Sequence, residues 1–402
     1  MKKMILCAIA MLAIATANAQ FVTIDGTNLR NPDGTRLFIK GTNLGNWLNP
    51  EGYMFGFRNT NSAHFINEMF CQLVGPDATA DFWKEFKDNY VTKDDIMFIK
   101  STGCNTIPLP LHYKLFTDED YMGLTSSQDG YKRIDNVVEW CREAGLYLIL
   151  DMHDAPGGQT GDNIDDSYGY PWLFESRRSQ ELLYKIWRGI AERYKDEPVI
   201  LGYEIMNEPI PHYWENKEEL KKRLVEIYKE CTVEIRKADR NHIILIGGAE
   251  WNNSFEFFTD WTFDDNIMFT CHRYGGEPTA KFIDQIIAFR DKTGLPMYMG
   301  ETGHNTDEWQ SAFTKVFIDN NIGYTFWPYK KMGGETMMSI AKPENWDLII
   351  KFAESDRSSY KKIQEARPDQ KTALKAMADF IENCKHRNCT PQQSYIESLR
   401  LK

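Results

Sequence analysis

The sequence lacks several features that mark common classes of protein. Beyond its N-terminal segment it has no unbroken apolar run long enough to cross a bilayer, so we expect no membrane span. It contains neither G-x-G-x-x-G nor G-x-x-x-x-G-K-[ST], the Gly-rich patterns that bind nucleotide phosphates. No pair of closely spaced Cys or His has the pattern of a zinc site. These absences predict a protein that needs neither a cofactor nor a metal.

Basic residues are outnumbered by acidic ones. The chain has 47 Lys and Arg against 58 Asp and Glu, a formal net charge of −11. Because so acidic a chain repels phosphate backbones, we expect no nucleic-acid partner and a neutral substrate instead. Aromatic residues are plentiful, with 19 Tyr, 23 Phe and 11 Trp. Most of these rings will be buried in a core, but enough remain to line a groove.

The N-terminal segment, residues 1–19, has the pattern of a secretory signal peptide. Lys2 and Lys3 precede a short apolar run, and Ala17-Asn18-Ala19 follows it as a cleavage site. We therefore predict cleavage after Ala19 and export. The mature chain, residues 20–402, should be secreted or periplasmic.

Cysteine is too scattered for a disulfide scaffold. Of the eight cysteines, Cys7 belongs to the predicted signal peptide, and Cys384 and Cys389 are close enough in sequence to form a small disulfide. The other five lie among apolar neighbours, as buried thiols commonly do. They are Cys71, Cys104, Cys141, Cys231 and Cys271.

No linker or low-complexity tract divides the chain, and short apolar runs alternate with amphipathic stretches. The turn residues Asn31-Pro32-Asp33-Gly34 predict an N-terminal hairpin. Eight candidate strands follow, each with helix-length sequence after it, which predicts an α/β fold: a (β/α)8 TIM barrel forming one catalytic domain. A doubly wound sheet is the alternative, but it would normally have a Gly-rich phosphate turn. The candidate strands are 37–42, 104–110, 146–152, 199–206, 242–247, 267–271, 296–300 and 322–327.

Polar and aromatic residues follow six of these strands at the point where each ends. Active sites of (β/α)8 barrels lie at the carboxyl ends of the strands, so these residues are the candidates for chemistry. Two of them are glutamates, in GYEIMNEPIP (202–211) and in MGET (299–302). The residues are Asn43, His153, Asn207, Glu208, His272, Tyr274, Glu301 and Trp327.

Two opposed carboxylates without a metal-ligand set indicate glycoside hydrolysis. Glu208 would act as acid/base and Glu301 as nucleophile in a retaining mechanism, with Tyr274 donating to Glu301. The remaining candidates would bind the substrate: Asn207, His153 and His272 through hydrogen bonds, and Trp327 as a stacking floor. Taken singly, a histidine here would more often be structural, and Trp327 could be a core ring.

The sequence resembles glycoside hydrolase family 5 from residue 21 to about residue 385. NEP at 207–209 resembles the acid/base motif of the family and MGET its nucleophile strand, which gives the same two roles to Glu208 and Glu301. KGTNLGNWLNPEG (40–52) and DMHDAPGGQTGDN (151–163) are similar to loops of fungal exo-β-1,3-glucanases. That likeness implies that Glu51 contacts a terminal glucose and that Asn163 also contacts sugar.

One position departs from the family. The family usually has an Arg on the second strand that supports the nucleophile, and here Pro108 takes its place in CNTIPLPLHYKLF. Glu301 would then depend on Tyr274 or His272, or on the substitutes His112 and Lys114.

We therefore expect a monomeric β-glycosidase that acts on a β-glucan or β-linked oligosaccharide. The alternative is a carbohydrate-binding protein of the same fold whose catalysis was weakened or lost with the Arg. The sequence does not distinguish the linkage, or exo from endo action. In the acidic loop, Asp162, Asp165 and Asp166 could bind calcium, but a solvated loop is the simpler interpretation.

Overall fold

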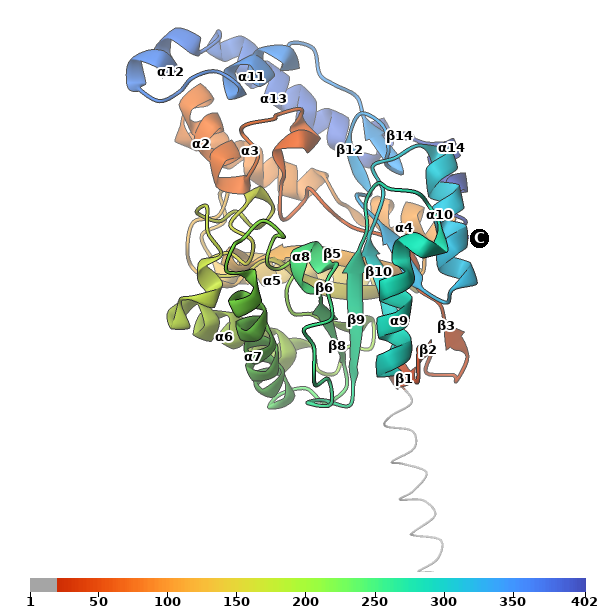
Figure 1. Ribbon diagram of the computed structural model, residues 1–402. Helices are drawn as coiled ribbons and strands as arrows, with labels where there is room; N and C mark the ends of the chain where they lie inside the picture. Colours follow the sequence, from red (N-terminus) through yellow and green to blue (C-terminus); the bar gives the residue numbers. More distant parts are fainter. Residues whose placement is uncertain (1–19) are drawn as a thin grey trace, which may run out of the picture.

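A computed structural model describes residues 20–402 (Figure 1). The predicted signal peptide lies outside the described residues, so its cleavage stays a prediction. Among residues 20–402, no helix combines the length and apolarity needed to cross a membrane.

Eight parallel strands close into a barrel, in the order β10-β11-β4-β5-β6-β7-β8-β9. Each strand pairs with its neighbour in the sequence, which confirms the predicted (β/α)8 barrel. The predicted strand at 37–42 is divided, because only Lys40–Thr42 joins the barrel. The strands are β4 (Lys40–Thr42), β5 (Thr106–His112), β6 (Tyr147–Asp154), β7 (Ile200–Glu204), β8 (Ile243–Gly247), β9 (Ile267–His272), β10 (Met297–Glu301) and β11 (Gly323–Phe326).

Helices surround the barrel on its outer side. In α6 the buried side chains Leu183, Trp187 and Ile190 recur at helical spacing, and the Ser176 hydroxyl caps the first turn by accepting from the Ser179 amide. The barrel helices are α4 (Lys93–Thr102), α5 (Ser127–Ala144), α6 (Arg177–Tyr194), α7 (Lys217–Arg236), α9 (Asp284–Thr293), α10 (Asp307–Asp319) and α14 (Gln393–Ser398).

A small antiparallel sheet precedes the barrel. It consists of β1 (Thr23–Asp25), β2 (Asn28–Arg30) and β3 (Arg36–Leu37), and the predicted turn at 31–34 joins β2 to β3. Its apolar side chains form one buried cluster with residues from the first half of the barrel strands, such as Ile149 and Leu201. The sheet therefore packs against the amino-terminal end of the barrel and leaves the carboxyl end open.

Pro108 fits within β5 because the strand is weakly paired on one side. The β4–β5 ladder contains a single register pair, Gly41 with Thr106, whereas β5 pairs with β6 along its length. The carbonyl of Pro108 accepts from the Leu44 amide, so its nitrogen faces the β4 side, where little pairing is lost.

A block of helices packs together at one edge of the barrel (Figure 1). Two segments far apart in the sequence build it, and the sequence did not reveal this pairing. Trp346 stacks on Phe380 at 4.6 Å and on Phe57 at 6.3 Å between ring centroids, so the block takes up many of the surplus aromatic rings. Its helices are α2 (Ala63–Val74), α3 (Pro76–Asn89), α11 (Trp346–Ala353), α12 (Tyr360–Ala366) and α13 (Gln370–Cys384).

The possible disulfide between Cys384 and Cys389 is not formed. Both thiols are free, and the Cys389 thiol instead donates to the Asn383 carbonyl at 3.3 Å. All other cysteines among the described residues are also free.

Candidate active site

Six of the nine predicted site residues line one cavity of about 290 Å³ at the carboxyl end of the barrel. Both glutamates of the predicted catalytic pair reach it, and Asn207 and His272 lie buried against its walls. The cavity is lined by Glu51, Tyr53, His153, Ile164, Glu208, Tyr274, Glu301, His304 and Trp327.

Glu208 and Glu301 face each other across His272. The Nδ1 atom of His272 lies 2.8 Å from Glu208 Oε1 and 3.6 Å from Glu301 Oε2. Tyr274 donates its hydroxyl to Glu301 Oε2 at 2.8 Å. One carboxyl oxygen of Glu208 and one carboxyl oxygen of Glu301 lie within 4.8 Å of each other. This separation is near the ~5–5.5 Å of retaining glycosidases and below the ~6.5–9.5 Å of inverting ones.

The backbone turns sharply to present Glu208. Strand β7 ends at Glu204, and Glu208 has a φ of +44°, in the left-handed region that costs a non-glycine residue free energy. Gln159 holds this turn: its side chain donates to the Asn207 carbonyl at 2.9 Å, and its own carbonyl accepts from the Ile210 amide at 3.1 Å. The strain is tolerated where it aims a carboxyl into the cavity.

Burial sets the protonation of the site. It raises the pKa of Glu208 to about 7, against the opposing effect of His153, and raises that of Glu301 to about 8, with His272 opposing and Glu208 adding to the shift. Burial lowers the pKa of His272 to about 4, so this ring is neutral at neutral pH. A neutral His272 can donate one N–H to Glu208. The carboxyl pair can hold a shared proton near neutral pH.

His153 and Trp327 form a stacked wall of the cavity. Their ring planes differ by 3° and their centroids lie 5.1 Å apart. His153 donates from Nδ1 to Asp151 Oδ2 at 2.9 Å, and its Nε2 accepts from Asn207 Nδ2 at 3.3 Å. The indole N–H of Trp327 donates to the Tyr53 hydroxyl at 2.8 Å.

Tyr53 and His304 are cavity residues that sequence reasoning missed. The Tyr53 hydroxyl lies 3.2 Å from His304 Nε2, and 40% of Tyr53 is exposed. Each lies just after a segment that the sequence analysis identified: Tyr53 follows Glu51, and His304 follows MGET (299–302). Their closeness to these motifs was the available signal.

The two substrate contacts implied by the exo-glucanase resemblance lie in different places. Glu51 lines the cavity, and burial raises the pKa of its carboxyl to about 7. Asn163 lies outside this cavity and lines a neighbouring hollow instead. The residue after it, Ile164, reaches the cavity.

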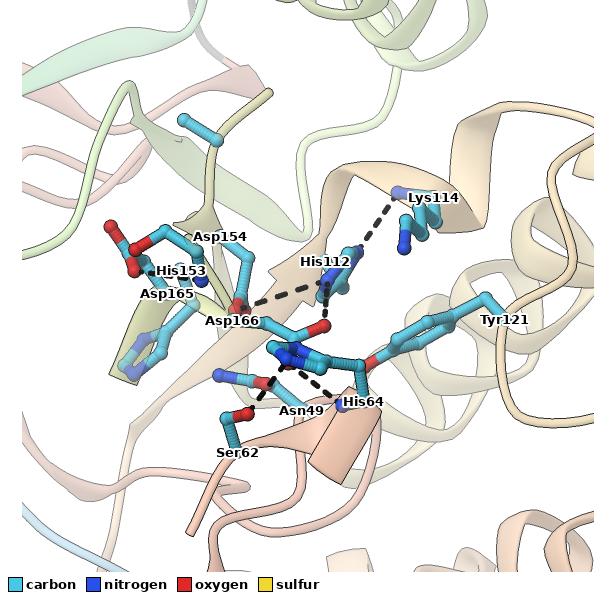
Figure 2. A network of polar contacts seen from close by, with 12 residues as sticks. Asn49, Ser62, His64, His112, Lys114, Tyr121, His153, Asp154, Asp165 and Asp166 are labelled. Atoms are coloured by element: carbon cyan, nitrogen blue, oxygen red, sulfur yellow. Dashed lines mark hydrogen bonds and ion pairs between the residues drawn. The ribbon is translucent and has the colours of Figure 1, made fainter. Parts of the chain in front are cut away.

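His112 and Lys114 do not replace the missing Arg, so that hypothesis is wrong. His112 Nε2 lies 3.4 Å from Asp166 Oδ2 and 4.0 Å from Asp154 Oδ1, and its Nδ1 accepts from the Lys114 amide (Figure 2). The Lys114 ammonium lies over the Tyr113 ring. Of the other two candidates, Tyr274 donates to Glu301, and His272 Nδ1 lies 3.6 Å from it.

The acidic loop after β6 is structural and largely buried, which corrects the expectation of a solvated loop. Asp165 accepts backbone N–H groups from Thr160, Gly161 and Ser167. Within residues 20–402, the one group of three His, Cys, Asp or Glu side chains close enough to hold a metal ion together is Glu208, His272 and Glu301.

Asn252 orients His272, and sequence reasoning missed it. It follows β8, in the short segment α8 (Ala249–Asn252), where Glu250, Trp251 and Asn252 all have φ between 54° and 64°. Lys221 and Lys217 clamp the Glu250 carboxylate at 2.7 and 3.2 Å, which stabilises this left-handed turn. Asn252 Nδ2 lies 3.3 Å from His272 Nε2. Donation there leaves the ring proton on Nδ1, facing Glu208.

Asn252→Ala should lower kcat about tenfold, because the net free energy of one hydrogen bond corresponds to roughly that change in rate. It should also move the basic limb of the pH–rate profile to higher pH, because Glu208 would lose a donor that stabilises its ionised form. Asn241→Ala is the matched control, since Asn241 precedes the same strand at the opposite end of the barrel. A lower melting temperature with an unmoved limb would reduce Asn252 to a structural role.

Comparison with known proteins agrees with this geometry. The family model "Cellulase (glycosyl hydrolase family 5)" matches residues 61–333. A β-xylosidase of Phanerodontia chrysosporium is 26% identical over 361 residues, covering 80% of this chain and 73% of the relative. A glucan 1,3-β-glucosidase of Kluyveromyces lactis is 25% identical over 357 residues, covering 82% and 80%.

Solved structures share the fold. An endoglucanase of the hyperthermophile Thermotoga maritima has a TM-score of 0.53 at 17% identity, covering 84% of this chain and 96% of that one. At this identity the likeness concerns the barrel alone.

Proposed function

Because the chain belongs to glycosyl hydrolase family 5 and is therefore a glycoside hydrolase, we propose that it cleaves β-glucosidic bonds in a β-glucan or its oligosaccharides with retention of configuration. The observation that carries this proposal is the short separation of Glu208 and Glu301 at the bottom of an aromatic-walled cavity. Relatives named as a glucan 1,3-β-glucosidase and as endoglucanases support a β-glucan as the substrate class. The predicted export signal fits a glycan outside the cytoplasm.

In the first step, a Glu301 oxygen attacks the anomeric carbon while Glu208 gives its proton to the departing glycosidic oxygen. The bond from carbon to the leaving group breaks, and a covalent glycosyl–enzyme ester forms. In the second step Glu208 takes a proton from water, whose oxygen attacks the same carbon and releases Glu301. The two inversions give net retention.

This chemistry requires the proton on Glu208 and the negative charge on Glu301. Burial raises the pKa of both carboxyls, so the empty pair can hold one proton between them. Positive charge developing on the sugar stabilises an ionised Glu301 and leaves that proton on Glu208. The Tyr274 hydroxyl supports the same anion. His272 can still donate to the carbonyl oxygen of a protonated Glu208, which leaves the acidic O–H for the leaving group.

The alternative, a carbohydrate-binding protein, draws its support from Pro108. Among residues 20–402, Glu301 forms no ion pair with a Lys or Arg, and the lack of such a partner weakens a nucleophile. The enzyme is the better proposal because both glutamates keep ordered donors and a short separation, which binding alone does not require.

The proposal is tested with purified protein on β-1,3-, β-1,4- and β-1,6-glucans and on mannan. We expect hydrolysis of at least one β-glucan, with the β-anomer as the first product seen by NMR. A first product in the α-configuration would contradict retention. Saturable binding without turnover on every glycan would favour the carbohydrate-binding alternative.

A further inference from the structure

Two further carboxyl groups lie inside the barrel below the catalytic pair, and the two catalytic steps use neither of them. Asp151 is on β6 and Glu204 is on β7, and the two residues are register partners in adjacent strands. His153 lines the cavity from β6, and Asp151, two residues earlier, points to the same interior side. Both carboxyl groups are buried, because Asp151 is 3% exposed and Glu204 is 2% exposed.

This pair can keep only one full negative charge. Among residues 20–402, neither carboxyl forms an ion pair with a Lys or Arg, and two adjacent buried carboxylates without a cation are costly. Burial raises the pKa of Asp151 and of Glu204 well above the ordinary value, and each is raised further by a neighbouring carboxylate. One proton therefore stays on the pair at neutral pH. The titratable groups that face it are His153, Asp154, Glu208, Tyr228, Cys271 and Tyr298.

The hydrogen-bond donors decide which carboxyl keeps the negative charge. Asp151 Oδ2 accepts the imidazole N–H of His153 at 2.9 Å, whereas Glu204 Oε2 accepts the Tyr298 hydroxyl at 3.1 Å. Asp151 Oδ1 is buried and has no hydrogen-bond partner within residues 20–402. A protonated carboxyl on the adjacent strand supplies the kind of donor that this oxygen lacks. The charge therefore belongs on Asp151 and the proton on Glu204.

An ionised Asp151 fixes two groups at the wall of the catalytic cavity. A carboxylate can only accept, so His153 keeps its proton on Nδ1 and its Nε2 can only accept. Asn207 must then turn its amide nitrogen toward the ring, where Nδ2 lies 3.3 Å from Nε2. If Asp151 were protonated, the His153 proton could move to Nε2 and the Asn207 amide would turn over. The charge on Asp151 thus sets which side of this amide a substrate meets.

We propose that Asp151 and Glu204 form a positioning pair for the reaction: Glu204 holds a proton, Asp151 stays ionised, and Asp151 thereby fixes His153 and Asn207 in one orientation. The proposal rests on the proposed function for the reaction that the pair serves. Neither residue touches the reacting atoms, so both act through the side chains above them.

Asp151→Asn and Glu204→Gln separate the two roles, because each amide has nearly the shape of the carboxyl it replaces. Asp151→Asn removes the charge and should lower kcat at least about tenfold, whereas the Glu204→Gln amide imitates a protonated carboxyl and should stay within about twofold of the wild type. Asp151 and Glu208 repel each other when both are ionised. Asp151→Asn should therefore lower the pKa of Glu208 and move the basic limb of the pH–rate profile to lower pH.

Asp239→Asn is the matched control. Asp239 is a buried carboxyl that also contacts an imidazole, that of His242, and accepts the Tyr203 hydroxyl at 2.7 Å. It precedes β8 at the opposite end of the barrel, so its replacement should lower the melting temperature and leave the basic limb unmoved. An unmoved limb in Asp151→Asn, or an equal loss of kcat in Glu204→Gln, would overturn the proposal.

The tautomer of His153 can be measured without turnover, which separates this proposal from the proposed function. Nitrogen-15 NMR of histidine-labelled protein at about pH 8, where a histidine is normally neutral, shows which ring nitrogen carries the proton. Loss of signals in His153→Gln identifies those of His153. We expect the wild type and Glu204→Gln to carry the proton on Nδ1, and Asp151→Asn to shift part of it to Nε2.

These outcomes decide the two proposals independently. If the wild type cleaves no glycan but shows the His153 proton on Nδ1, the catalytic proposal fails and the pair still positions the cavity wall. A wild-type proton on Nε2 would overturn the positioning pair even in an active enzyme. Should Asp151→Asn not fold, the wild type and Glu204→Gln give the same decision.

Discussion

Glu301→Gln is expected to lower kcat on a natural β-glucan by at least ~10³-fold while leaving glycan binding almost unchanged. The amide fills the same space and can still accept from Tyr274, but it cannot form the covalent ester. Kinetics and calorimetry on the same preparation check both halves of this expectation.

Glu208→Gln should have a different signature. We expect a ~10²–10⁴-fold loss on natural glycans and a much smaller loss on activated aryl glycosides, whose leaving groups need little protonation. Burial raises the pKa of Glu208 to about 7, and the wild type should lose activity as rising pH removes this proton. Glutamine cannot ionise, so the basic limb of the profile should disappear in the variant.

Glu277→Gln serves as the control for both substitutions. Glu277 is exposed on the loop after β9, and its replacement should leave every rate unchanged. Near-normal turnover of a natural glycan by either Glu301→Gln or Glu208→Gln would refute the assignment of the pair.

The second large effect is a loss of stability, and it concerns a buried ion pair outside the active site. Lys330 Nζ lies 2.8 Å from Asp95 Oδ1, both side chains are fully buried, and the Tyr329 hydroxyl donates to the same carboxylate. Lys330 also donates to the Cys384 carbonyl at the end of α13, so this cluster ties the barrel to the helical block. Lys330→Met should lower the free energy of unfolding by about 3–5 kcal/mol, because Asp95 would remain buried without its cation.

Denaturant unfolding as a function of pH measures this effect. Although burial opposes the shift, Lys330 and the hydrogen bonds to Asp95 lower its folded pKa to about 2, below the unfolded value of about 3.9. The pair therefore contributes its full stability above pH ~4 and loses it as pH falls toward 2. In Lys330→Met this acid sensitivity should be reduced.

Lys342→Met is the matched control, because Lys342 pairs with Asp347 at 2.9 Å on the surface, where such a pair contributes little. The double variant Lys330→Met with Asp95→Asn should recover part of the loss. Equal destabilisation by Lys330→Met and Lys342→Met would show that the buried ion pair contributes no more to the free energy of unfolding than the surface pair does.

The barrel and most of the site were predictable from the sequence for the same reason. Parallel strands of a barrel all end at one face, so residues that follow separate strands, such as His153, Glu208 and Glu301, must meet there. No knowledge of side-chain packing was needed for that inference.

The residues that were missed depend on loop geometry. Asn252 reaches His272 only through three consecutive left-handed residues, which no local pattern announces. Asn163 and Ile164 differ by one position, and the turn of the short 3-10 helix η4 (Asn163–Asp165) alone decides which of them faces the cavity. His112 follows the strand that carries Pro108, but its ring faces Asp166 and Asp154 rather than Glu301.

The helical block places a constraint on the order in which this chain can fold. Helices α2 and α3 are synthesised early, yet the rings that cover Phe57 and Phe86 come from α11 and α13, after the last barrel strand. Closing so long a loop carries an entropic cost, and contacts of this range slow folding. A nascent chain therefore keeps an aromatic face open to water until α13 has been synthesised.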